Sequence, residues 1–166
     1  LEAPLQFHHL QRATFETGGL PGGCLYQLAA SALPRMEHLE IWLGCEAYGG
    51  GADAGELKPL LQPGHQPALR RLGLKNSEIG YALVKGLVGS PLLAQLERLD
   101  LSMGTLSDGA AQLIEAQIEQ FKHLESLNLS DNYLSGVAIR RLEDLPLAVN
   151  TSGQKQEEED GHLFTS

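Results

Sequence analysis

One short leucine pattern recurs along the chain and constrains the fold more than any other feature of the sequence. The segments LRRLGLKNSEI, LERLDLSMGTL and LESLNLSDNYL, which begin at Leu69, Leu96 and Leu124, align without a gap on the form LxxLxLxxNxL. Two weaker copies, LQRATFETGGL from Leu10 and MEHLEIWLG from Met36, precede them. The five starts are 26, 33, 27 and 28 residues apart. Repetition at a near-constant period indicates a stack of similar units rather than one central core.

Each unit combines a strand pattern with a helix pattern. In the fourth unit Leu99 and Leu101 alternate with polar residues, which is the period of a strand with one wet face. An apolar stripe at helical spacing follows Asp108, which we expect to cap that helix. The stripe consists of Ala110, Leu113, Ile114, Ile118 and Phe121. In the third unit we expect the helix to end before Gly89 and Pro91.

Alternating strands and helices predict parallel strands joined by right-handed crossovers. Helices are wider than the spacing between strands, so such a stack must bend, with the strands on the inside. We therefore predict an α/β fold, a right-handed βα solenoid with a parallel concave sheet and convex helices.

Period, strand motif and helix together resemble the ribonuclease-inhibitor type of leucine-rich repeat, over roughly residues 10–145. The resemblance implies a horseshoe of repeats. The Gly-rich second unit and the wording LEIWLG are most similar to uncharacterised bacterial leucine-rich repeat proteins. Ribonuclease inhibition does not carry over, because the inhibitors are much longer and rich in cysteine, whereas this chain has two cysteines.

The chain departs from that family at the turn after each strand, where an asparagine or cysteine is usual. The five units carry Gly18, Gly44, Ser77, Gly104 and Asn132 there. Only Asn132 can donate the side-chain amide that bridges neighbouring turns. We expect the other turns to depend on glycine torsions and on water, and to be less rigid.

Both ends of the repeat array need a cap, which divides the chain into four parts. Residues 1–9 are an N-terminal cap or the remnant of a preceding repeat, and residues 10–145 hold five repeats. Residues 146–154 form a C-terminal cap, with Ala148 to Thr151 as a candidate strand. Residues 155–166 form an acidic tail, which is solvated, docks on a basic partner or folds back onto the chain's own arginines.

The charge and hydrophobicity of the chain limit the kinds of partner that it can bind. The chain has 12 basic and 21 acidic residues and a formal charge of −9, which opposes nucleic-acid and anionic-membrane binding. No signal peptide or window of 18 apolar residues is visible. We expect a cytoplasmic protein with no nucleic-acid or membrane partner.

The search for catalytic or metal-binding motifs is negative, so we expect no enzyme activity, no cofactor and no metal. Cys24 and Cys45 lie 21 residues apart with no histidine at ligand spacing. The glycines at 49–51 precede a helix and could cradle a phosphate, but Asp53 would cap those N–H groups itself. We expect this segment to be a flexible loop that carries Tyr48 outward.

The outward strand positions hold the candidate binding residues. Read across the units they form three columns: Arg12, His38, Arg71, Arg98 and Ser126; Thr14, Glu40, Gly73, Asp100 and Asn128; Glu16, Trp42, Lys75, Ser102 and Ser130. Glu40 and Asp100 could neutralise the arginines, or the arginines could recognise an acidic partner. Trp42 is either an exposed hot spot or covered by the Gly-rich loop. The predicted partner-binding residues are Arg12, His38, Glu40, Trp42, Tyr48, Arg71, Lys75, Arg98, Asp100 and Asn128.

We predict a non-catalytic module that binds a protein or peptide through its concave face and the Gly-rich rim loop. Five strands about 4.8 Å apart give an inner face of about 340 Å², which suits a peptide better than a standard protein interface. Two alternatives remain at this point: an accessory, substrate-positioning domain of a larger enzyme or complex, and a structural unit that self-associates as a weak homodimer.

Overall fold

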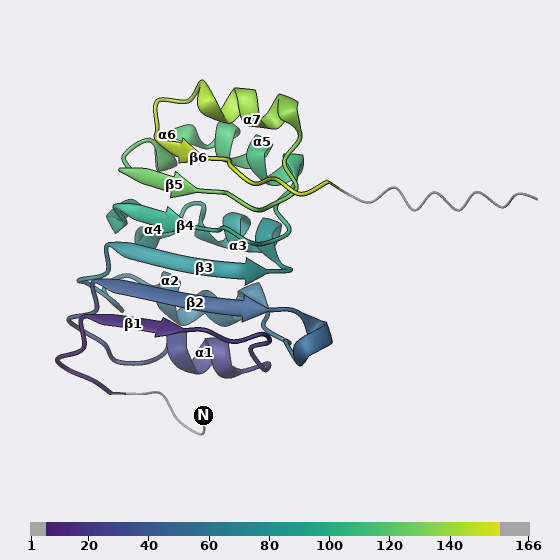
Figure 1. Cartoon of the computed structure of the whole chain (residues 1–166). Helices are drawn as coiled ribbons and strands as arrows, with labels where there is room; N and C mark the ends of the chain where they lie inside the picture. The colour runs from purple at the N-terminus through teal and green to yellow at the C-terminus, as the bar shows by residue number, and fades with distance from the viewer. Residues whose placement is uncertain (1–5, 157–166) are drawn as a thin grey trace, which may run out of the picture.

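A six-stranded parallel sheet organises the molecule in a computed structural model that describes residues 6–156. Every strand is parallel to its neighbours, and the order in the sheet is the order in the chain. Figure 1 shows the strands stacked from β1 at the bottom to β6 at the top. The strands are β1 (Arg12–Phe15), β2 (His38–Gly44), β3 (Arg71–Ser77), β4 (Arg98–Asp100), β5 (Ser126–Asn128) and β6 (Val149–Asn150).

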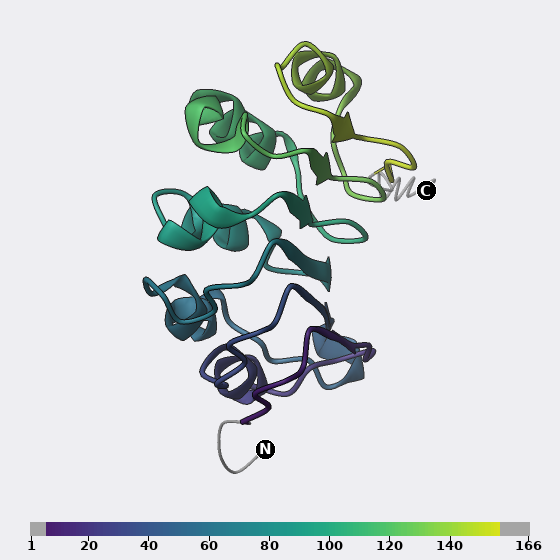
Figure 2. The same cartoon turned by 90° about the vertical axis from the view of Figure 1, so that its left-hand side faces the viewer.

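The α-helices all lie on one side of this sheet, and the other side carries none of them, as the turned view in Figure 2 shows. We call the side without α-helices the open face. The helices are α1 (Cys24–Ala29), α2 (Lys58–Leu61), α3 (Gly80–Leu87), α4 (Pro91–Gln95), α5 (Asp108–Ala116), α6 (Ile118–Phe121) and α7 (Gly136–Glu143). Two short 3-10 helices, η1 (Glu46–Tyr48) and η2 (Ala54–Leu57), follow β2. The predicted mixed α/β class is confirmed.

The core lies between the sheet and the helices and is almost entirely aliphatic. Leu39, Leu72, Leu99 and Leu127 occupy one register position across four neighbouring strands, and each is at most 2% exposed. Phe121, on α6, is fully buried. Because these inward positions are fixed by packing, the side chains between them are held on the open face.

The helices differ from the sequence expectation in three places. Asp108 is the first residue of α5 rather than its cap, and its carboxylate bonds to Ser135 of the next unit. The stripe from Ala110 to Phe121 belongs to two helices, because the backbone at Gln117 leaves the helical region between α5 and α6. The third unit also has two helices: α3 ends before Gly89, and Pro91 opens α4 behind the capping Ser90.

The second unit has the least α-helix of the five repeat units. Its apolar segment forms the 3-10 helix η2 and the single-turn α2, with Pro59 at the start of α2. Asp53 caps η2 by accepting a hydrogen bond from the Gly55 N–H at 2.7 Å, in keeping with the cap expected there.

The candidate strand between Ala148 and Thr151 is confirmed as β6, which pairs with β5. None of the described helices is long and apolar enough to cross a membrane. The predictions for residues 1–5 and for the acidic run 157–160 concern parts of the chain outside the described residues.

Candidate functional site

A shallow hollow of about 570 Å³ lies on the open face and runs from β2 to β6. The strand register places the predicted columns side by side: Arg12 pairs with His38, His38 with Arg71, and Arg71 with Arg98. The polar residues that line the hollow are His38, Glu40, Arg71, Arg98, Asp100, Ser126, Asn128 and Asn150. Six of the ten predicted binding residues therefore meet in one place.

The arginines on this face form no ion pair with Glu40 or Asp100 of the neighbouring acidic column, in contrast to the pairing that the sequence suggests. Within the described part of the chain, no carboxylate oxygen lies within 4.0 Å of the guanidinium of Arg12 or Arg71. Arg98 contacts Glu125 at 3.1 Å, but both side chains are more than half exposed. An exposed pair of this kind is worth at most about 1 kcal/mol, and the arginine can exchange it for another carboxylate.

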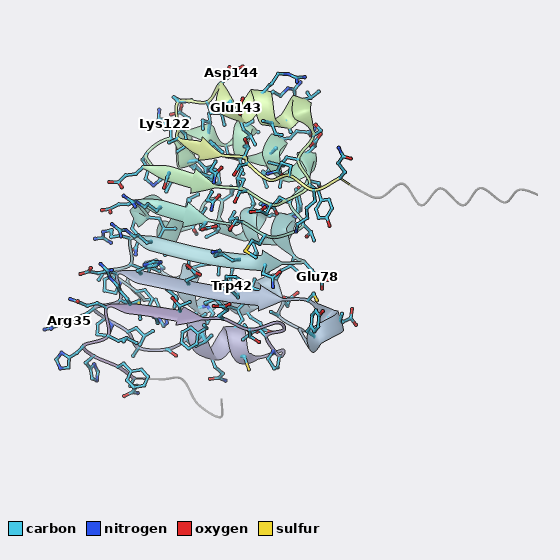
Figure 3. The ribbon with its side chains drawn as sticks, viewed as in Figure 1. Arg35, Trp42, Glu78, Lys122, Glu143 and Asp144 are labelled. Carbon is cyan, nitrogen blue, oxygen red and sulfur yellow. The ribbon has the colours of Figure 1, made fainter. Side chains whose placement is uncertain are left out.

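Glu40 and Asp100 instead bind groups of their own. The Glu40 carboxylate accepts a hydrogen bond from Trp42 Nε1 at 2.7 Å and lies 3.6 Å from Lys75 Nζ. The Lys75 ammonium also lies 5.0 Å from the centre of the Trp42 ring. These contacts on β2 and β3 correct the picture of Trp42 as a free hot spot, because the half-buried ring is already covered on one side by Lys75. Trp42 is labelled on β2 in Figure 3.

Asp100 begins a second arrangement, a row of linked side chains that we call the amide ladder: Asp100, Asn128 and Asn150. Asn150 Nδ2 donates to Asn128 Oδ1 at 3.0 Å, and Asn128 Nδ2 donates to Asp100 Oδ2 at 3.1 Å. Each member also accepts the backbone N–H of the serine two residues later, at Ser102, Ser130 and Ser152.

The ladder explains features that the sequence left open. Ser102 and Ser130, which the alternation assigns to the outward side, are less than 9% exposed and so offer little surface to a partner. Asn150 was missed as a lining residue, although the recurring pattern Asp/Asn-x-Ser at positions 100, 128 and 150 could have revealed it.

The rim loop after β2 is anchored by backbone bonds rather than free, contrary to the flexible loop expected. Gly50 N–H donates to Cys45 O and Gly51 N–H donates to Leu20 O, both at 2.9 Å. The carboxylate of Glu78, labelled in Figure 3 near the end of β3, accepts the Glu46 N–H at 2.9 Å. Tyr48 projects from this anchored loop with 76% of its surface exposed, as the sequence predicts.

Other chemistry is sparse. No group of three or more His, Cys, Asp or Glu side chains within residues 6–156 could hold a metal ion. Cys24 and Cys45 are free thiols, both half-buried. The arrangement on the open face can therefore bind charged and hydrogen-bonding groups, and neighbours on the same sheet hold Glu40, Asp100 and Asn128 in place.

Comparison with known proteins places the fold but not the activity. No family model and no curated protein matches the chain. Among solved structures, it is similar to the crystal structure of a structural genomics target from Bacteroides fragilis, with a TM-score of 0.86 and 30% sequence identity. The match covers 93% of this chain and 44% of that one, so the chain spans less than half of that protein's length.

Proposed function

We propose that the chain is a leucine-rich repeat solenoid of the ribonuclease-inhibitor type, whose open face binds a partner protein or peptide without catalysing a reaction. The repeat proposal is supported by the coincidence of the leucine motif with β3, β4 and β5. Each motif copy supplies two inward residues, such as Leu99 and Leu101 in the fourth unit, which are 1% and 3% exposed. Sequential parallel strands with every α-helix on one side fit a stack of such units.

One observation carries the binding proposal: Arg71 lines the hollow with no carboxylate of the described residues within 4.0 Å of it. Arg98 lies beside it on the next strand. Arginine is a frequent anchor of protein interfaces, because its planar guanidinium donates two parallel hydrogen bonds to a carboxylate. Two adjacent arginines over a hollow therefore favour recognition of a partner that carries carboxylates.

The size of the hollow favours a peptide segment over a large protein surface. A standard interface buries about 800 Å² on each partner, more than twice the roughly 340 Å² of the face between β1 and β5. Tyr48 does not line the hollow, but it is exposed on the rim loop and can offer a separate aromatic contact. We expect modest affinity and a partner segment that lies in the hollow.

Charge reversal tests the proposal. Arg71→Glu with Arg98→Glu should abolish crosslinked recovery of the partner from cells that make the protein, because both anchors then repel carboxylates. The matched control is Lys85→Glu with Arg140→Glu, which reverses two exposed charges on the helical side, on α3 and α7. Partner recovery that is unchanged by the Arg71 and Arg98 variant, or lost equally in the control, would contradict a site on the open face.

A further inference from the structure

We propose that the hollow selects an extended peptide in which an acidic residue stands directly next to a basic one. This inference rests on the proposed function and names the chemistry of its partner. It follows from two oppositely charged rows on the open face and from the geometry of an extended chain.

The two rows run side by side across the strands. The basic row is Arg12, His38, Arg71 and Arg98, one residue on each of four neighbouring strands. The acidic row lies two residues further along the same strands and includes Glu40 on β2 and Asp100 on β4. Two residues of strand separate the rows by about 6.6 Å.

Gly73 lies in the acidic row between Glu40 and Asp100, and it leaves the floor of the hollow without a side chain. A Cβ atom at this position would lie 3.1 Å from Glu40 Cγ, so the Glu40 side chain already leans toward that space. The remaining floor beside Arg71 and Asp100 is where a peptide backbone can approach most closely.

The two acidic residues of the row differ in how far they are neutralised. Glu40 has a cation, Lys75, at 3.6 Å. The donors that Asp100 has within residues 6–156 are neutral, the Ser102 N–H at 2.9 Å and Asn128 Nδ2 at 3.1 Å. Among the described residues, neither Asp100 nor Arg71, on the neighbouring strand, has a partner of opposite charge within 4.0 Å.

An extended peptide that lies along the rows fits this pair of charges. Successive side chains of an extended chain point in opposite directions. If the peptide lies between the two rows with its side chains parallel to the sheet, one peptide side chain reaches toward Arg71 and the next reaches toward Asp100. An Asp or Glu next to a Lys or Arg thus meets one partner of opposite charge on each side.

Overall charge also favours such a sequence over a purely acidic one. The chain carries a formal charge of −9, so a run of carboxylates is repelled at long range. An acidic and basic pair has no net charge to repel, and its basic member is attracted to Asp100. A purely acidic segment would also place a carboxylate against Asp100.

Four hexapeptides with blocked ends test the inference. Three of them carry a central pair, Glu-Lys, Glu-Gln or Gln-Lys, between two glycines on each side. The fourth has Glu-Gly-Lys at its centre and one flanking glycine fewer, so that its length is the same. Binding is read from the fluorescence of Trp42, the one tryptophan of the chain, and from backbone amide chemical shifts. Glu-Lys should bind about fivefold more tightly than Glu-Gln or Gln-Lys, which corresponds to about 1 kcal/mol for each exposed charge pair.

The Glu-Gly-Lys peptide carries the same two charged residues as the Glu-Lys peptide but not next to each other, so it tests whether their spacing matters. The inserted glycine points both charged side chains to the same side, so its affinity should fall to that of the singly charged peptides. Asp100→Asn keeps an oxygen for the Ser102 N–H and should lower Glu-Lys binding to the Glu-Gln level. Asp144→Asn, at the exposed end of α7, is the matched control and should change the affinity of neither the Glu-Lys nor the Glu-Gln peptide (Figure 3).

Equal binding of the four peptides, binding of none, or an unchanged preference in Asp100→Asn would overturn the inference. These outcomes differ from failure of the proposed function. If the cellular partner is still lost with Arg71→Glu and Arg98→Glu, the open face remains a binding site whose ligand has other chemistry. If that partner is retained as well, both proposals fail.

Discussion

The turns after the early strands and the turns after the late strands satisfy their backbone in different ways. After β1 and β2 the backbones touch directly: Leu20 N–H donates to Leu43 O at 2.8 Å, and Cys45 N–H donates to Gly18 O at 3.0 Å. Gly44 makes this approach possible, with a φ of 71° and no side chain toward Gly18. In this region the glycines themselves close the gap between units.

After β5 a side chain, rather than the backbone of the next unit, supplies the hydrogen bonds between turns. The amide of Asn132 is fully buried, and its Nδ2 donates to Leu101 O, Leu129 O and Ser130 O at 3.0 to 3.1 Å. Its Oδ1 accepts from the N–H groups of Gly104 and Leu106.

Gln154 repeats this pattern one unit later. Its Nε2 donates to Leu129 O, Thr151 O and Ser152 O, and its Oε1 accepts the Leu134 N–H at 2.9 Å. The turn after β6 therefore has the same chemistry as the turn after β5.

A turn without the asparagine can therefore still satisfy its backbone groups. Backbone groups buried between units need partners, and either a bridging amide or a neighbouring backbone can supply them. At the turns of Gly18 and Gly44, where we expected water, backbone groups of the two units bond directly to each other. Substitutions should destabilise the two kinds of turn in different ways. At the glycine turns an added side chain should clash with the backbone, and at the asparagine turn a lost amide should leave polar groups unsatisfied.

Gly44→Ala should produce the largest loss of stability. A Cβ at this position would lie 2.0 Å from Gly18 O, and it would also be held at a positive φ. We expect a loss of about 4 kcal/mol, because a backbone atom cannot give way as a side chain can. Urea unfolding, followed by circular dichroism, measures the loss.

Gly49→Ala is the control for that clash. Gly49 also has a positive φ, of 84°, but a Cβ there would meet nothing within 4 Å. Its cost should be the torsional strain alone, about 1 kcal/mol. Similar losses in the two variants would show that close backbone approach at Gly44 does not hold the early turns together.

Asn132→Ala should have the next largest effect, about 3 kcal/mol. The substitution removes the bridge between the ends of β4 and β5 and takes the bonded partner from the Gly104 N–H, the Leu106 N–H and Leu101 O. Gln154→Ala should cost only about 1 kcal/mol, because this partly exposed bridge lies at the edge of the sheet, where water can replace it. Urea unfolding of both variants checks the order, and an equal loss would contradict the role of burial.

Sequence alone could predict the α/β class and the columns of the open face, since both follow from leucine spacing. It could not predict that Glu40 and Asp100 leave the arginines unpaired. Each carboxylate has several possible partners within reach, and the sequence does not say which of them it binds. In the structure Glu40 binds Trp42 and Lys75, and Asp100 binds Asn128. Gln154 was missed because it is a different residue type from Asn132, although it stands four residues after Asn150 as Asn132 stands after Asn128.

The smallest expected effect is at Asp108, which joins two late units as a charged group. The Ser135 hydroxyl donates to Asp108 Oδ2 at 2.6 Å, and the Ser135 N–H donates to Oδ1 at 2.8 Å. These bonds, with a smaller contribution from the charge of Arg141, hold the pKa of Asp108 below its ordinary value of 3.8. A lowered pKa in the folded state means that ionised Asp108 stabilises the fold.

Asp108→Asn should therefore lower stability by less than about 1 kcal/mol at neutral pH, since the group is only partly shielded from water. The stabilisation is complete above the unfolded pKa and disappears as the pH falls through the lower folded value, because the carboxylate is then protonated in both states. Unfolding curves from pH 7 to pH 2 should show the variant and the native chain converging at acid pH. Asp144→Asn, whose side chain has no such partner among the described residues, should show no convergence of this kind. A difference for Asp108→Asn that stays constant across this range would mean that Asp108 acts through its shape and not its charge.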